Sequence, residues 1–306
     1  MNLICPKDKA QLIHAHDHIS CPQCKAKYSQ DNNIFSFIAN PDSFYEGAYL
    51  NRISYKKIQN NLLNKLNLWV INSGYLGKVS RSFAEGSTLL ELGCAAGVSY
   101  FGEQFKMIGC DLSFSSLKHA SSIYDKCLYA DPLVGLPLPD NSVDGVISSY
   151  FWEHLDINQK NLCLQEIYRV LKPGGKVIFL YDVETKNPLI SYFKKINYDL
   201  YKEHFLDQDG HIGYHAINEN IKIFTNNKFS IQSNIPLEKT FIMGPSVYYK
   251  LALWNKYSFI FKLFGKIGSS VFYKPFSLII RVFDVVFQFL PDSWARINLT
   301  ILKVIK

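Results

Sequence analysis

The chain has 306 residues, of which 48% are hydrophobic and 19% charged, and its formal net charge is +7. This length and composition fit a globular protein that buries the core of one large domain or two. Its seven cysteines do not suggest a secreted disulfide framework, and its first residues lack the basic and apolar regions of a signal peptide. No uninterrupted apolar run reaches about 18 residues, which argues against a spanning helix. We therefore expect a cytoplasmic protein.

The first 38 residues contain two short cysteine motifs around a polar, histidine-rich segment. Cys5 belongs to the first motif, and Cys21 and Cys24 form the second. Joined by a hairpin, two such motifs supply the tetrahedral thiolate set that zinc prefers. Asp8 stands where the first motif would have its second cysteine, so we predict a zinc-ribbon-like leader that binds zinc through these four residues. Histidines could complete the zinc site instead: His14, His16 and His18. Alternatively, the ribbon has lost its metal and is held by a small apolar core.

Residues 39–84 read as a helical leader. Apolar residues recur at a spacing of three to four over 58–70, which predicts helices with one apolar face. Tyr45 and Tyr49 precede this pattern. Two roles remain open for these tyrosines, namely packing against the leader and direct contact with a bound molecule.

Apolar runs of strand length alternate with helical segments over 85–241, and one more apolar run follows near the end of the chain. This alternation predicts an α/β fold in which a parallel sheet has helices on both faces. The seven expected strands lie near 88–92, 106–111, 127–131, 143–149, 175–181, 229–236 and 297–305.

The first of these strands closes on Glu91 and opens into a turn of small residues, from Gly93 to Gly97. Such a turn lets backbone amides approach a ligand closely. The second strand ends at Asp111, about 20 residues after the first acid, where nucleotide-binding sheets offer a carboxylate to ribose hydroxyls. The turn lacks the full pyrophosphate pattern, which argues against a dinucleotide site.

Ligands of such sheets bind at the carboxyl ends of the strands. That rule by itself brings five residues from four strands to one edge: Glu91, Gly93, Asp111, Asp131 and Ser149. The sequence therefore predicts one ligand site at this edge.

In their order and spacing these motifs resemble the class I S-adenosylmethionine-dependent methyltransferases, specifically the type 11 group. The resemblance extends over about 90 residues, in the blocks 91–97, 109–120, 131–147, 153–155 and 166–176. One departure is Ala95, where the family usually has a middle glycine. The first 38 residues resemble the zinc-ribbon-like leader found in front of many methyltransferases of this group.

The resemblance implies a Rossmann-like, seven-stranded sheet that binds S-adenosyl-L-methionine. The turn from Gly93 to Gly97 would approach the methionine part, Asp111 the ribose hydroxyls and Asp131 the adenine amino group. Glu91 would orient the turn and the ammonium group through water. The predicted cofactor-binding residues are Glu91, Gly93, Cys94, Gly97, Asp111, Leu112, Asp131 and Ser149. In similar enzymes, a leader like 39–84 covers the cofactor cleft and helps to form the substrate pocket.

Methyl transfer from a sulfonium is an in-line displacement with a good leaving group, so the protein mainly aligns donor and acceptor. A general base is optional. The candidates are His154, just past the fourth strand, and His211, in a segment that resembles a recurrent family element. Because Glu153-His154 is common in the family across many acceptors, a structural role is the alternative for His154.

Residues 242–290 form an insert before the last strand. Over 276–290 the polar residues Ser277, Arg281, Asp284 and Gln288 share one narrow helical stripe and leave a wide apolar face. From residue 242 to the end, nine lysines and arginines oppose two aspartates, a net charge of +7. A basic, apolar insert suits a membrane surface, or a lid over a lipid-linked acceptor. A capping or dimerisation subdomain is the alternative.

We therefore expect methyl transfer to a small-molecule, glycan or lipid-linked acceptor, by a protein that could be a homodimer and peripheral to the membrane. One alternative is an enzyme like the ribosomal-RNA guanine methyltransferases, which the apolar setting of the positive charge disfavours. A non-catalytic scaffold is the other. The expected domains are 1–38, 39–84, 85–241, the insert 242–290 and the last core strand in 291–306.

Overall fold

The computed structural model of the chain describes residues 2–15, 18–39, 46, 62–268 and 273–306. Tyr45, Tyr49 and His16, for which the sequence predicts roles, lie outside these residues. Among the described residues, no helix combines the length and the apolar character that crossing a membrane requires.

All seven predicted strands are present. They are β5 (Thr88–Leu92), β6 (Lys106–Asp111), β7 (Lys126–Tyr129), β8 (Val143–Ser149), β9 (Leu171–Asp182), β10 (Phe229–Leu237) and β11 (Ile297–Val304). They stand side by side in the order β7-β6-β5-β8-β9-β11-β10. The strands from β5 to β9 are parallel, whereas β11 runs antiparallel to both of its neighbours. The α/β prediction is confirmed.

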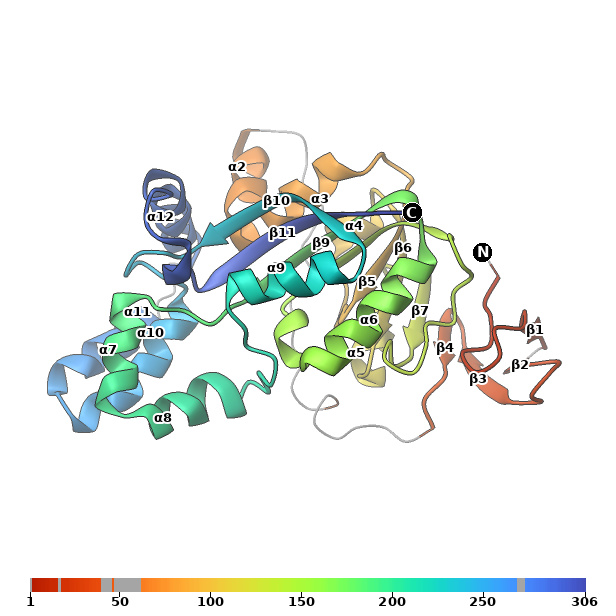
Figure 1. Cartoon of the computed structure of the whole chain (residues 1–306), viewed down its shortest axis with the longest axis horizontal. Helices are drawn as coiled ribbons and strands as arrows, with labels where there is room; N and C mark the ends of the chain where they lie inside the picture. Colours follow the sequence, from red (N-terminus) through yellow and green to blue (C-terminus); the bar gives the residue numbers. More distant parts are fainter. Residues whose placement is uncertain (1, 16–17, 40–45, 47–61, 269–272) are drawn as a thin grey trace.

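Helices cover both faces of the sheet (Figure 1). One hydrophobic cluster joins the sheet to α6 (Ile157–Val170) and α9 (Ile217–Asn226). The other joins it to α3 (Tyr75–Ser82), α4 (Ser99–Gly102) and α5 (Phe114–Ala120). Because both faces are covered, β5 reads as a nearly continuous apolar run rather than an alternating one.

The leader extends the sheet and does not stand apart from it. Its strands are β1 (Ile13–His14), β2 (His18–Ser20), β3 (Lys27–Asp31) and β4 (Ile34–Ser36). β4 pairs in parallel with β7, so the sheet of the described residues has eleven strands instead of the expected seven. The leader thereby covers an edge strand whose N–H and C=O groups would otherwise be unpaired. Its apolar side chains belong to the same cluster as the core.

The insert packs at the opposite end of the sheet from the leader, as Figure 1 shows. Its elements are α10 (Pro245–Leu251), the 3-10 turns Ala252–Lys256 and Phe259–Phe261, α11 (Lys262–Gly268) and α12 (Tyr273–Val286). Three elements that follow β9 pack with it: α7 (Pro188–Ile196), α8 (Tyr198–Lys202) and the π-helical turn Glu203–Asp207. Two distant segments therefore form one helical subdomain, with Phe193, Trp254 and Leu251 in its core.

Helix α12 presents its polar stripe to the protein. Ser277, Arg281 and Asp284 are buried, and Arg281 Nη1 donates to Asp284 Oδ2 over 3.1 Å. Arg281 Nε also donates to the Trp69 carbonyl in α2 (Leu62–Val70), and Asp284 Oδ1 accepts from the Glu238 N–H. Because these contacts bury Arg281 and Asp284, the polar stripe of α12 has to face the rest of the protein.

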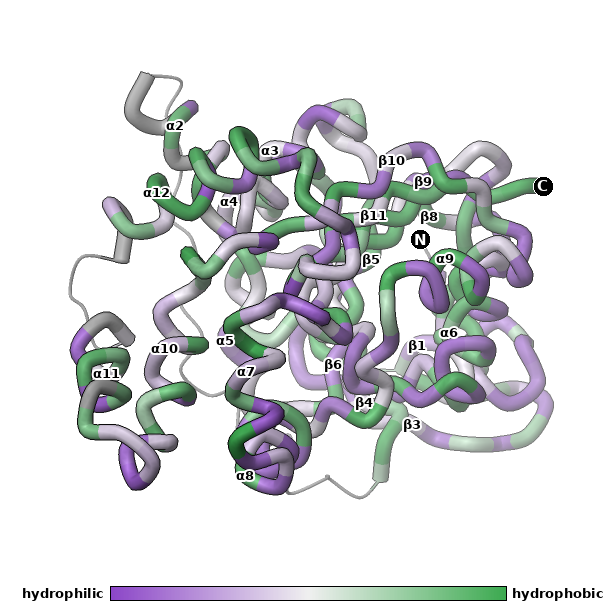
Figure 2. The backbone as a smooth tube through the Cα atoms, turned by 60° about the vertical axis from the view of Figure 1, so that its left-hand side comes forward, coloured by the Kyte–Doolittle hydropathy of each residue, from purple (hydrophilic) through white to green (hydrophobic). Residues whose placement is uncertain are grey.

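The apolar face of α12 is consequently exposed. Figure 2 colours the backbone of this helix by the hydropathy of its residues. Its exposed side chains, together with one just beyond the helix, are Ile279, Val282, Val285, Val286 and Phe289. Val285 is 56% exposed and Phe289 77%. The aromatic residues of the preceding segment behave differently, because Phe261 and Phe264 pack into the helical subdomain. The apolar face of α12 is therefore not buried against the described residues of the same chain, which fits either a membrane surface or a dimer interface.

The orientation of α12 has a measurable consequence. Asp284→Ala leaves the Arg281 guanidinium buried without its carboxylate, which costs about 3 kcal/mol or more of unfolding free energy. Val285→Ala in the exposed face should change that free energy by less than about 0.5 kcal/mol. Urea denaturation of both variants measures the difference, and a larger loss for Val285→Ala would show that α12 packs through its apolar face.

Candidate functional site

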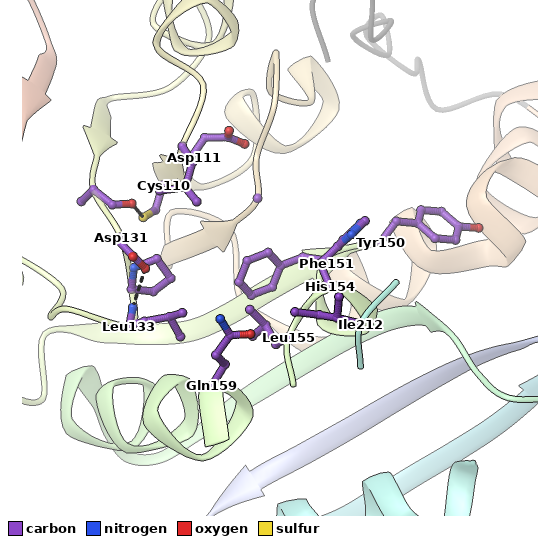
Figure 3. A pocket seen from close by; sticks show the side chains of 14 residues that line it. Cys110, Asp111, Asp131, Leu133, Tyr150, Phe151, His154, Leu155, Gln159 and Ile212 are labelled. Carbon is purple, nitrogen blue, oxygen red and sulfur yellow. Dashed lines mark hydrogen bonds between the residues drawn. The ribbon is translucent and has the colours of Figure 1, made fainter. Parts of the chain in front are cut away.

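A cavity of about 260 Å³ opens at the carboxyl ends of β5 to β8 (Figure 3). Five of the residues predicted from the sequence line it: Gly93, Asp111, Leu112, Asp131 and His154. Asp111 and Asp131 come from neighbouring strands or the residues just past them, as the edge rule for parallel sheets requires. The geometry thus gathers these residues around one space.

Asp111 is buried and holds the two turns that border the cavity. Its Oδ2 accepts from the N–H of Ala95 over 2.7 Å, and its Oδ1 accepts from the N–H of Ser113 over 2.9 Å. Ser113 in turn caps α5, because its Oγ accepts from the N–H of Ser116. One carboxylate therefore ties the glycine turn to the start of α5.

The turn after β5 uses a left-handed backbone at three positions. Gly93 has φ +63°, Gly97 φ +77° and Ala95 φ +45°. A Cβ on Gly93 would lie 3.1 Å from Phe151, so glycine is required there for space as well as for conformation. Ala95 adopts a conformation that costs an L-residue about 1–2 kcal/mol. Its hydrogen bond to Asp111 offsets that cost.

Glu91 is not among the residues that line the cavity, but it supports the turn beside it. It is buried, and its Oε2 accepts a hydrogen bond from the Tyr124 hydroxyl. The same hydroxyl accepts from the N–H of Val98 over 2.8 Å, at the start of α4. Glu91 thereby positions the turn through Tyr124, which is the orienting part of the role inferred for it.

Four of the predicted cofactor residues are not among those that line the cavity in the described part of the chain: Glu91, Cys94, Gly97 and Ser149. The Cys94 sulfur lies toward β6, where a Cβ on Gly109 would approach it to 2.7 Å. Burial raises the pKa of the Cys94 thiol well above its ordinary value. The Cys94 side chain is therefore part of the core, and only its backbone is placed near the turn.

Aromatic residues after β8 were missed by the sequence reasoning. Tyr150 and Phe151 line the cavity, and Tyr150 has φ +56° although it is not glycine. Such strain clusters at functional sites, but nothing in the sequence reveals it. Gln159 and Ile212 also line the cavity. The only available signal was that Tyr150 and Phe151 directly follow a strand that ends at the ligand edge.

His154 and His211 meet, although they are far apart in the sequence. Their ring centroids are 5.2 Å apart, and His154 Nδ1 lies 3.1 Å from the Gly210 carbonyl oxygen. His211 stacks on Tyr214, and burial lowers the pKa of its imidazole. Beside them, burial and the nearby Asp182 raise the pKa of Glu153 to about 8.

A second cavity of about 440 Å³ lies between the helical subdomain, α12 and the turn Ile71–Gly74. Tyr150 lines both cavities. Lys250, Arg281, Arg296 and Glu238 give the second cavity a charged lining, in which each cation is paired with a carboxylate. Arg296 is paired with Asp182 at 3.0 Å and with Glu238 at 2.7 Å, Arg281 with Asp284 and Lys250 with Asp209. This cavity is the candidate space for an acceptor.

The four predicted ligands of the leader converge. Their ligand atoms lie within 4.8 Å of one another, with 3.7 Å between the Cys5 and Cys24 sulfurs and 3.1 Å from the Cys21 sulfur to Asp8 Oδ2. A hydrogen bond from the Ala10 N–H, with one from Cys21, lowers the pKa of Asp8 to about 2. Of the described histidines in this region, His14 instead packs edge-on against Phe35.

The fold and the cavity define a class I methyltransferase domain, the class that uses S-adenosylmethionine. Residues 90–179 match the family model described as "Methyltransferase domain". The chain thus contains a domain of this family, as its motifs predicted.

Curated relatives share this part of the chain. A demethylmenaquinone methyltransferase of Symbiobacterium thermophilum is 31% identical over 40% of this chain and 52% of its own length. A tRNA (carboxymethyluridine(34)-5-O)-methyltransferase of Arabidopsis thaliana is 36% identical over 32% of this chain and 24% of its own. A tRNA(Thr) (cytosine(32)-N(3))-methyltransferase of Saccharomyces cerevisiae is 24% identical over 63% and 33%. The chain spans about half or less of the length of these relatives.

Among solved structures, the chain is similar to the geranyl diphosphate C-methyltransferase of Streptomyces coelicolor. The TM-score is 0.49 at 13% identity, over 84% of this chain and 94% of the other. A likeness at this level adds nothing on the acceptor.

Proposed function

We propose that the protein transfers the methyl group of S-adenosylmethionine to an acceptor held where the two cavities meet. The observation that supports this best is the convergence of Gly93, Asp111 and Asp131 on one cavity at the carboxyl ends of the central strands. Carboxylates here suit ribose hydroxyls and an adenine amino group, because both are hydrogen-bond donors. The cavity residues therefore fit this cofactor.

The cofactor supplies a methyl group on a sulfonium centre, which is already a good leaving group. The chain's residues have to bind and orient it, which Asp111 does together with the turn that it holds in place. Phe151, Leu155 and Ile212 give the cavity apolar walls that exclude water. His154, which lines the cofactor cavity, and His211 beside it are the candidate general bases for the acceptor's proton. Alignment then accounts for most of the catalysis.

For the acceptor, we propose a lipid-linked molecule. Arg281 and Ser277 on the inner side of α12 line the second cavity, whereas Ile279, Val282 and Val285 on its outer side are exposed. One helix thus separates a polar, charged space from an apolar surface, which suits a polar head group attached to an apolar chain. The relatives include tRNA and quinone methyltransferases, so the shared domain does not by itself select the acceptor class.

The segment before α12 supports a contact with an anionic membrane. Exposed lysines lie next to exposed apolar side chains in the insert, with Lys262 and Lys266 beside Leu263, and Phe259 78% exposed. Anionic lipid attracts such lysines, and the apolar side chains add buried area. A second copy of the chain covering α12 is the competing occupant.

We also propose that Cys5, Asp8, Cys21 and Cys24 hold a structural zinc ion. Three sulfurs and a carboxylate within 4.8 Å match the donor set and number that closed zinc sites use. Such an ion would hold together the two loops of a leader with little core of its own.

Cofactor binding tests the central proposal. Asp111→Ala should lose about 1.5–3 kcal/mol of binding free energy for S-adenosylhomocysteine, because charge-assisted hydrogen bonds are removed and the glycine turn loses its anchor. Isothermal titration calorimetry measures this, with Asp199→Ala in the exposed part of α8 as the matched control. Absence of binding by the folded parent protein would refute the proposed function.

Metal analysis and hydrogen exchange test the leader. We expect the leader to hold one zinc equivalent, which the Cys24→Ser variant lacks, and its loss to destabilise the leader because ligation energy is folding energy for so small a unit. Chelation should reduce amide protection in β2 and β3 first, whereas β4 keeps its protection because it pairs with β7. If the parent protein contains no zinc and a chelator leaves its stability unchanged, the structural zinc ion is ruled out and the ribbon is held by its apolar core.

Vesicle co-sedimentation tests the membrane contact. A Lys262→Glu, Lys266→Glu double variant should bind anionic vesicles more than tenfold more weakly than the parent, since each lysine near the surface contributes about 1 kcal/mol. Lys106→Glu, Lys222→Glu, at sites in the core domain, is the control with the same charge. Salt should weaken binding only partly. If neither the parent nor the double variant pellets with anionic vesicles, the membrane contact is wrong. The insert would then be covered by another subunit or act as a lid.

A further inference from the structure

Two loops dock tightly next to the cofactor cavity. One is the 3-10 turn Trp152–His154 after β8, and the other is the segment 209–213. The N–H of Gly213 donates to the Glu153 carbonyl over 2.9 Å. A Cβ on Gly213 would lie 1.6 Å from the Leu155 carbonyl oxygen, so only glycine allows this approach. The docking places Glu153, His154 and His211 around one point, with ligand-type atoms within 4.8 Å of one another.

The Glu153 carboxylate is the unusual member of this group. The side chain is fully buried, and neither of its oxygens has a hydrogen-bond partner among the described residues. The backbone N–H groups of Glu153 and Asp182 lie near enough to lower the pKa of this carboxyl, against the larger effect of burial. Nδ1 of His211 is likewise buried without a partner among these residues. Two buried polar groups without partners in one cluster call for a further group that binds them.

The nearest buried cation does not fill this role. Lys160 lies below the same loops, but its ammonium group is committed to three other acceptors. These are the Gly213 carbonyl at 2.7 Å, His215 Nδ1 at 3.0 Å and Asn220 Oδ1 at 3.1 Å. With three donors and three acceptors, Lys160 has none left for Glu153.

We propose that Glu153, His154 and His211 bind a divalent first-row transition-metal cation. Two imidazoles and a carboxylate are a common ligand set for zinc and for non-haem iron, and three protein ligands leave coordination positions open. The hydrogen bond between His154 Nδ1 and the Gly210 carbonyl orients the ring, as partners behind metal ligands do. A bound cation would also give the buried Glu153 carboxylate the partner that it lacks among the described residues.

The site lies between the two spaces of the proposed reaction. His154 lines the cofactor cavity, and His211 lines a small cavity of about 60 Å³ with Lys250 and Arg296, which also line the second cavity. A cation here would lower the pKa of an acceptor hydroxyl, so that its proton leaves to solvent. The new C–O bond then forms at the methyl carbon as the C–S bond breaks and a neutral thioether leaves. This consequence, a hydroxyl acceptor, rests on the proposed function, whereas cation binding does not.

Zinc titration of the chelator-treated full chain tests the site. We expect the parent to bind two equivalents, one in the leader and one at Glu153. The Glu153→Gln and His211→Gln variants should each lose the zinc equivalent at Glu153 or bind it at least a hundredfold more weakly. Both variants should keep the equivalent in the leader, which Cys24→Ser lacks. The exposed His119→Gln is the control and should keep both.

Binding of S-adenosylhomocysteine reports separately on folding and on the proposed function. A Glu153→Gln variant that still binds it, yet has lost one zinc equivalent, supports the cation site. A parent that binds zinc only in the leader, or Glu153→Gln and His211→Gln variants that bind two equivalents, would overturn it and leave a water molecule as the bridge between these groups.

Discussion

The carboxylate of Asp111 is the constraint on which the rest of the site depends. It accepts the N–H of Ala95 from the glycine turn and the N–H of Ser113 from the cap of α5. Behind it, Glu91 and Tyr124 hold Val98 at the start of α4. The turn can keep a left-handed alanine because these bonds oppose its strain. The glycine turn is therefore already ordered before a cofactor binds. The entropy lost in ordering this turn lowers the free energy of unfolding, and the binding free energy of the cofactor is not reduced by it.

Helix α12 links this site to the surface of the protein. Its buried Arg281–Asp284 pair faces α2 and the end of β10, and that choice forces valine and isoleucine side chains outward. A buried ion pair contributes little net stability, so the main effect of this pair is to fix which face of α12 is buried. The result is a charged cavity on the inner side of α12 and an apolar surface on its outer side, an arrangement that suits an amphipathic acceptor.

The docked loops explain why the catalytic region contains unsatisfied groups. Gly213 allows segment 209–213 to press onto the turn that holds Glu153 and His154, while Lys160 anchors the loop from below. The Glu153 carboxylate is buried as a consequence. A buried carboxyl group without a hydrogen-bond partner lowers the stability of the fold. Proteins keep such groups mainly at functional sites.

The sequence by itself determined the seven core strands, the strand edge that carries the cavity and the four leader residues that converge. These follow from local signals: apolar runs of strand length, glycines where the turn needs positive φ, and cysteine spacing. Only the tertiary structure decided that β4 joins the edge of the core sheet, that α12 turns its polar stripe inward and that Glu153 clusters with two histidines. Each of these depends on a partner distant in the chain: the open edge of β7, the Trp69 carbonyl, and a loop that Gly213 lets come close. Hydrophobic periodicity identifies the faces of an element, but the partner that it meets decides which face is buried.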